Sequence, residues 1–152
     1  MHIIIRDACK QDCEAICRLN RDALGYDFAL EATRSRLEAI LATAGNRLFV
    51  AEADSLVVGY VHAAEYECTY TNSLKNILAL AVDENHRGQG IGHRLLHKVE
   101  SWAEETGSSG VRLVSGFDRE GAHRFYLACG YTDRKNQKNF IKILSDRRGS
   151  GE

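Results

Sequence analysis

The feature that most constrains the fold of this chain is an apolar run followed directly by a glycine-rich loop and an amphipathic helix. Residues 77–82 are all apolar, which is typical of a strand buried on both faces in the middle of a sheet. Glycines at positions 88, 90 and 92 follow, and apolar residues then recur at the helical period as far as Ala103. Such a unit aims unpaired backbone N–H groups and the positive end of the helix at one point. The sequence therefore predicts an anion site, for which a diphosphate is a natural ligand.

Other phosphate-binding patterns fit this loop less well. The pattern GxxxxGK followed by Ser or Thr is absent, and GxGxxG fails because position 93 is His93. Alternate glycines let the backbone approach a phosphate closely, and Arg87 adds a charge-assisted contact. The alternative interpretation is a glycine-rich helix start without a ligand.

The rest of the chain predicts strands and helices of a single domain. We expect strands at residues 3–5, 47–53, 56–67, 74–82, 111–115 and 139–144, and helices at residues 7–24, 29–44, 90–107 and 120–129. Residues 74–115 form one clear strand-helix-strand crossover. Because no repeat or linker interrupts the pattern, we expect one domain over residues 1–146 and a flexible tail at residues 147–152.

Composition excludes several classes of protein. The 152 residues include 20 Lys and Arg against 21 Asp and Glu, and no apolar run approaches the roughly 18 residues that a membrane-spanning helix needs. The apolar stretch at residues 3–5 is too short for a signal peptide. Five cysteines form an odd set without CxxC pairs, which fits a reducing compartment. We therefore expect a cytoplasmic protein without a membrane partner.

The near-zero net charge averages two unlike halves. Residues 1–84 carry 8 basic and 13 acidic side chains, whereas residues 85–152 carry 12 and 8. The basic half holds the glycine-rich loop, and the acidic half holds Glu65 and Glu67. This distribution favours one anionic and one cationic ligand.

Two motifs resemble the signatures of one family, the GCN5-related N-acetyltransferases (GNAT). Residues 80–92, with the pattern R-x-x-G-x-G at Arg87, Gly90 and Gly92, resemble its acetyl-CoA signature. Residues 121–131 resemble its second signature, Ala-His-x-Phe-Tyr-x-x-x-Gly-aromatic. The order of strands and helices is also similar to that of the family over residues 3–144, which is essentially the whole chain.

The resemblance implies an α/β (α+β) fold with acetyl-CoA as cosubstrate. A mixed, mostly antiparallel twisted sheet of six to seven strands would be flanked by about four helices, and a splayed central strand pair would bind CoA. The backbone of residues 80–82 would bind the pantetheine arm, and that of residues 88–92 the pyrophosphate. The implied cofactor contacts are Leu80, Ala81, Val82, Arg87, Gly88, Gln89, Gly90, Ile91, Gly92, Asp118, Ala122, His123 and Tyr126.

The resemblance also implies direct transfer of acetyl to a primary amine, with Tyr126 near the CoA sulfur as the general acid. A base is needed, because an alkyl ammonium with a pKa of about 10.4 has no free lone pair at neutral pH. Glu65 and Glu67 share one face at a strand end and could attract the amine or relay its proton. Glu67 is the first candidate and Glu65 the second, with a solvated surface pair as the alternative. Asn76 stands where histone-modifying members have a glutamate, so a direct copy of their mechanism is not expected.

The acceptor and the partners are less constrained. A small-molecule amine and a peptide amine both stay open, because variable loops determine the acceptor. Asn76 favours a second hypothesis, a catalytically weak CoA-binding sensor or partner protein of the same fold. The basic C-terminal region lacks a nucleic-acid-binding motif and interleaved aromatics, so we expect no nucleic acid. His93 and His97 could chelate a metal, but Arg94 replaces the Glu of the HExxH pattern, so we expect none. The resemblance leaves a homodimer open.

Overall fold

The computed structural model describes residues 2–145, so the tail expected at residues 147–152 lies outside the described residues. The chain divides into two compact units, residues 2–113 and residues 114–145. The first unit contains the sheet and three helices, and the second contains one helix and a long extended segment. The single domain over residues 1–146 stays a prediction.

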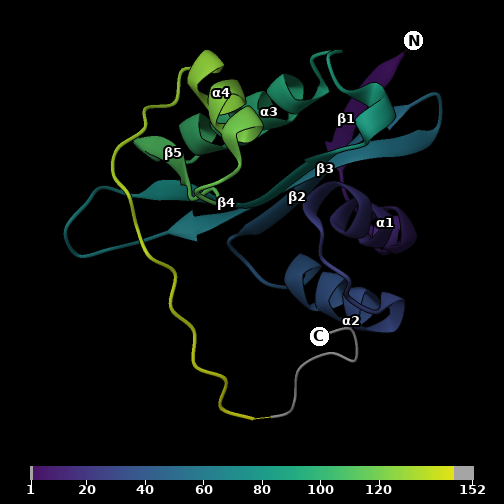
Figure 1. Cartoon of the computed structure of the whole chain (residues 1–152), viewed down its shortest axis with the longest axis horizontal. Helices are drawn as coiled ribbons and strands as arrows, with labels where there is room; N and C mark the ends of the chain where they lie inside the picture. The colour runs from purple at the N-terminus through teal and green to yellow at the C-terminus, as the bar shows by residue number, and fades with distance from the viewer. Residues whose placement is uncertain (1, 146–152) are drawn as a thin grey trace. The chain divides into compact units, whose positions relative to one another are not determined.

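The first unit is built on a five-stranded sheet in the order β1-β2-β3-β4-β5 (Figure 1). Its strands are β1 (Ile3–Asp7), β2 (Asn46–Ala53), β3 (Leu56–Tyr66), β4 (Leu74–Val82) and β5 (Gly110–Leu113). Neighbours are antiparallel from β1 to β4. Strands β4 and β5 are parallel, since helix α3 (Ile91–Glu105) connects them as a crossover. The mixed, mostly antiparallel sheet is confirmed.

Helices cover both faces of this sheet. Helices α1 (Cys13–Leu24) and α2 (Leu30–Leu41) lie on one face, and α3 lies on the other (Figure 1). The face under α1 and α2 is closed by a cluster of buried residues, namely Cys13, Ile16, Leu19, Leu37, Leu48, Val50, Val57, Tyr60 and Ala81. The two helices thus bury the apolar stripe that their sequences indicate.

Helix α3 packs closely on β3 at a glycine. Leu95, Leu96 and Val99 are buried at helical spacing on the side of α3 that meets the sheet. A Cβ at Gly59 would lie 3.0 Å from the carbonyl oxygen of Ala81 and 3.3 Å from the nearest atoms of α3. Gly59 therefore allows an approach that any larger residue would obstruct.

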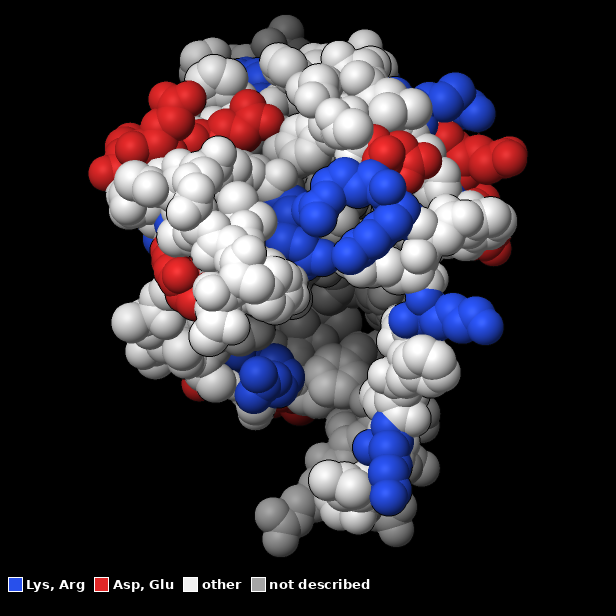
Figure 2. Space-filling view, turned by 90° about the vertical axis from the view of Figure 1, so that its left-hand side faces the viewer, with Lys and Arg blue, Asp and Glu red and all other residues white. Residues whose placement is uncertain are grey.

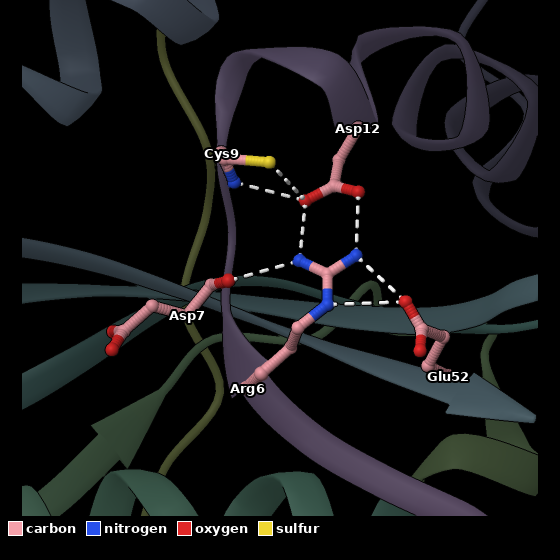
Figure 3. A network of polar contacts seen from close by, with 5 residues as sticks. All are labelled: Arg6, Asp7, Cys9, Asp12 and Glu52. Carbon is pink, nitrogen blue, oxygen red and sulfur yellow. Dashed lines mark hydrogen bonds and ion pairs between the residues drawn. The ribbon is translucent and has the colours of Figure 1, made fainter. Parts of the chain in front are cut away.

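An arginine network ties β1, β2 and the start of α1 together (Figure 3). The guanidinium of Arg6 donates to both carboxylate oxygens of Asp12 at 2.9 Å and to Glu52 Oε1 at 3.0 Å. Asp12 Oδ2 also accepts from the backbone N–H of Cys9 at 2.9 Å. Burial by itself would raise the pKa of Asp12, but the hydrogen bonds from Arg6 and Cys9 hold it below its ordinary value.

This network also explains the largest difference between an expected and an observed boundary of a helix or strand. The first helix is expected from residue 7, but α1 begins at Cys13. A 3-10 turn, η1 (Lys10–Asp12), precedes it and brings the Asp12 carboxylate back to Cys9.

Among residues 2–145, no helix is both long and apolar enough to cross a membrane.

The second unit contains α4 (Glu120–Ala128) and an extended segment, residues 131–145, that has neither helix nor strand. Basic side chains are spaced along this segment (Figure 2). The strand expected at residues 139–144 is therefore wrong, and the described residues form five strands rather than six or seven. Apolar and β-branched residues favour an extended backbone, but a strand also needs a partner edge. No strand among residues 2–145 pairs with this segment.

Candidate functional site

One edge of β4 is only partly paired. Strand β3 pairs with β4 as far as Val82, whereas β5 pairs only with the first four residues of β4. Leu78 is an extra residue in β4, because His62 of β3 faces Ala79 and the following residue of β3 faces Ile77. From Leu78 to Val82 the second edge of β4 has no strand partner among the described residues. Its N–H and C=O groups are therefore available to an extended ligand.

The loop after β4 has the backbone geometry of an anion site. Gly88 and Gly90 both have φ of +78°, a conformation that favours glycine, and a Cβ at either would meet nothing within 4 Å. Gly90 is the N-cap of α3, and no side chain caps the amides of the first helical turn. Arg87 lies exposed beside these glycines. The predicted residues 80–82 and 87–92 thus follow one path, from the free edge of β4 to the N-terminus of α3.

Glu65 is the counter-ion of a fully buried lysine. The side chain of Lys75 has no exposed surface, and its Nζ lies 2.6 Å from Glu65 Oε1. The same Nζ donates to Thr106 Oγ1 and Ser108 Oγ at 2.7 Å each, so all three ammonium protons have acceptors. The ring of Trp102 lies 4.5 Å from the ammonium nitrogen. Glu65 therefore stabilises the α3 face of the sheet, whatever part it takes in catalysis.

Glu67, unlike Glu65, is not the counter-ion of a buried cation among the described residues. It is exposed just beyond the end of β3, and its Oε1 accepts a hydrogen bond from Ser73 Oγ at 2.9 Å. Among residues 2–145 no Lys or Arg side chain forms an ion pair with it. Its negative charge is available to a cationic ligand.

Three polar side chains meet on the face of the sheet that α1 and α2 cover, opposite to the α3 face and beside the point where β4 and β5 diverge. Arg112 of β5 donates from Nη1 to Asn76 Oδ1 of β4 at 2.7 Å, and the two residues are register partners. The Arg112 guanidinium also lies 4.3 Å from the centre of the Tyr66 ring. Lys75, next to Asn76, contacts α3, so alternation directs Asn76 to the face of α1 and α2.

His62 lies on the same face as Tyr66, because residues at even spacing in a strand share a face. Its Nε2 is 2.9 Å from Asn46 Oδ1, and its backbone faces Ala79 next to the bulge. Burial lowers the pKa of His62, because it disfavours the charged imidazolium, so the ring is neutral at pH 7.

The remaining predicted site residues, Asp118, Ala122, His123 and Tyr126, belong to the second unit. His123 Nε2 lies 2.8 Å from the carbonyl oxygen of Gly116, which ties α4 to the turn before it. The ring of Tyr126 packs against those of Phe125 and Tyr131, with centroids 5.3 Å and 6.0 Å away. Burial raises the pKa of Tyr126, so the phenol keeps its proton at neutral pH.

The sequence pattern did not indicate Lys75, Arg112 or His62 as site residues. His62 and Arg112 each interrupt a stretch that is otherwise apolar or small, and that interruption was the signal available, since such residues are seldom buried without a partner. Lys75 follows Leu74 directly before the apolar run, next to the polar Asn76, and gave no such signal. No group of three or more His, Cys, Asp or Glu side chains within residues 2–145 is placed to hold a metal ion.

Known proteins resemble this chain in sequence. Residues 44–133 match the family model of the acetyltransferase (GNAT) domain. N-acetyltransferase 8 of Mus musculus is 32% identical over 71% of this chain and 47% of its own length. The aminoalkylphosphonate N-acetyltransferase of Salmonella typhimurium is 28% identical over 92% of this chain and 90% of its own. The chain thus spans about half the length of the N-acetyltransferase 8 relatives from mouse and rat.

Solved structures resemble it in fold. The aminoglycoside N-acetyltransferase AAC(6')-Iy in complex with CoA has a TM-score of 0.83 with this chain. The match covers 94% of this chain and 96% of the other, at 18% identity. The expected fold is confirmed apart from the number of strands.

Proposed function

From the premise that the chain belongs to the GNAT acetyltransferase family, we propose that it transfers acetyl from acetyl-CoA directly to a primary amine. The observation that carries the proposal is the path from the free edge of β4 to the glycine-rich N-terminus of α3. A free strand edge suits the amides of a pantetheine arm, and uncapped helix amides suit a diphosphate. CoA contains both groups in that order.

Different residues of the chain would bind different parts of CoA. The backbone of Leu80, Ala81 and Val82 would bond the pantetheine arm. The amides of residues 88–92, with the charge of Arg87, would hold the pyrophosphate. Ala122 and His123 would add contacts from the second signature, and Asp118 would add one from just before it. The CoA complex of AAC(6')-Iy supports this ligand class.

Acetyl-CoA would supply the activated acetyl thioester. The amine loses a proton, a C–N bond forms as the C–S bond breaks, and the thiolate takes up a proton. Tyr126 would donate that last proton, since its phenol is protonated at neutral pH. Glu67 would attract the ammonium and receive its proton, directly or through water. Glu65 is the second candidate, because its charge already neutralises Lys75.

The acceptor is proposed to be a small-molecule amine, with a peptide amine as the other class. The relatives carry the names of an aminoalkylphosphonate and an aminoglycoside N-acetyltransferase. Both names describe small molecules with amino groups, although one is acidic and the other is not.

The test is CoA release with a panel of primary amines, combined with Tyr126→Phe. We expect turnover by the wild type and a loss of kcat of about 100-fold in the variant, with a much smaller effect on CoA affinity because the aromatic ring is retained. Tyr131→Phe is the matched control, because this ring packs on Tyr126 without a proposed role in proton transfer. Tight CoA binding without turnover of any amine would refute the enzyme and favour the sensor or partner protein instead.

A homodimer is part of the proposal, and sedimentation of the full chain tests it. Phe140, Ile141 and Leu144 are 84% to 86% exposed, and a second copy could cover such side chains. A monomer at all concentrations would contradict this.

A further inference from the structure

Arg112 is a half-buried cation that forms no ion pair with any carboxylate among the described residues. Two other cations of the same unit are neutralised, Arg6 by two carboxylates and Lys75 by one. A guanidinium has five N–H donors, and within residues 2–145 the Arg112 side chain donates only to Asn76. Most of its donors and its whole charge are left for a ligand.

Two contacts hold this guanidinium in one orientation. Asn76 Oδ1 binds one nitrogen at 2.7 Å, and the Tyr66 ring covers one face at 4.3 Å. Both partners stand on strands of the sheet, so the arrangement is rigid. Stacking leaves the edge of the planar group free, and this edge binds a carboxylate or phosphonate with two parallel hydrogen bonds. Because the group is already ordered, binding costs little entropy.

The position of Arg112 relates it to the acceptor rather than to CoA. The Asn76–Arg112 pair is the last but one before β4 and β5 diverge at Leu78. With the diphosphate at α3 and the pantetheine arm along residues 82 to 80, the thioester would come close to Leu78. Asn76 is two residues away, about 7 Å along the strand. That distance fits a molecule whose amine nitrogen lies at the thioester and whose acidic group, two or three bonds away, forms a hydrogen bond to Arg112.

We propose that Arg112, presented by Asn76 and Tyr66, is an anion subsite for the acceptor, which is a small primary amine bearing a carboxylate or phosphonate. The inference rests on the proposed acetyl transfer and adds the chemical class of the acceptor. Arg112 attracts the acid while the amine points toward the thioester near Leu78, so the subsite orients a zwitterionic molecule. A polycationic amine would be repelled at Arg112.

The experiment compares pairs of primary amines in which one member has an acidic group and the other does not. One pair is β-alanine and β-alaninamide, and the other is 2-aminoethylphosphonate and ethanolamine, so carboxylate and phosphonate are tested separately. In the wild type we expect kcat/KM to be at least tenfold higher for the acid of at least one pair. Arg112→Gln should bring that ratio close to one, mainly through KM. Arg112→Lys should keep part of it, because it keeps the charge and loses the fork.

The ratio does not depend on the amount of folded enzyme, so partial unfolding of a variant cannot mimic the effect. Arg47→Gln is the control, since Arg47 is also half-buried and lies over an aromatic ring, but is paired with Asp7. This variant should retain the wild-type ratio. Turnover without a preference for either acid, or a preference that survives Arg112→Gln, would overturn the proposal.

A binding measurement separates this inference from the proposed function. The CoA-loaded protein is titrated with 2-aminoethylphosphonate and with ethanolamine, and backbone amide signals of β5 are followed by NMR. Stronger binding of the phosphonate that is lost in Arg112→Gln would support the subsite even if no amine were acetylated, in which case acetyl transfer alone fails. Equal binding of the two probes would overturn the subsite while leaving acetyl transfer to its own assay.

Discussion

Replacing Glu65 by Gln is expected to destabilise the protein strongly, because it leaves the ammonium of Lys75 buried without a counter-ion. Removing one partner of a buried ion pair costs about 3–5 kcal/mol, and the lower end applies here because 36% of the Glu65 side chain is exposed. A loss of about 3 kcal/mol in a chain of this size corresponds to a melting temperature lower by about 9 °C.

A double-mutant cycle with Lys75→Met tests the cause. Methionine fills a similar volume without a charge, so Glu65→Gln in that background should cost less than about 1 kcal/mol, as for a surface charge. Urea unfolding of the four proteins, followed by circular dichroism, gives the free energies of unfolding. An equal cost of Glu65→Gln with and without Lys75 would refute the buried-pair argument.

The same four proteins separate the structural part of Glu65 from a catalytic one. Acetyl transfer per folded molecule is compared between Lys75→Met and the double variant. If Glu65 serves only Lys75, the two activities should agree, whereas Glu67→Gln should reduce activity in either background. If Glu65→Gln reduces activity in the Lys75→Met protein, Glu65 becomes the first candidate for the general base and Glu67 the second.

Three further outcomes follow from single positions. Gly90→Ala should cost about 1 kcal/mol in urea unfolding, because alanine is strained at φ of +78° although no atom crowds its Cβ; a neutral result would contradict the strain. Gly59→Ala should cost about 2 kcal/mol, because its Cβ would lie 3.0 Å from a backbone oxygen, whereas Gly110→Ala, with 3.5 Å to the nearest atom, should be nearly neutral. The pKa of Asp12 is lowered in the folded protein, so its contribution is present above about pH 4 and is lost as pH falls through the lower folded-state pKa. Asp12→Asn should therefore reduce the difference in unfolding free energy between pH 7 and pH 3, and an unchanged profile would argue against the network.

Local pattern predicted most of the elements of the first unit. The apolar run at residues 77–82 and the stripe of α3 are short-range signals, since a strand or helix reports its buried face within a few residues. The left-handed conformations at Gly88 and Gly90 are local as well, because glycine tolerates a positive φ at little cost. These residues made the loop recognisable before its geometry was known.

The segment at residues 139–144 shows where local pattern fails. Its residues favour an extended backbone, but a strand is defined by hydrogen bonds to another strand, and no strand among the described residues pairs with this segment. The bulge at Leu78 was also not foreseen, because it depends on how two strands pair rather than on either strand alone.

The sequence by itself determined the family resemblance, the glycine-rich anion loop and the order of the strands and helices of the first unit, since all of these depend on neighbours in the chain. The tertiary structure alone decided what the charged side chains do. Glu65 meets Lys75 across a strand pair, and Arg112 meets Asn76 over a separation of 36 residues. Electrostatic pairing depends on distance and burial in space, so the difference between a neutralised cation and one left for a ligand arises only once the sheet has formed.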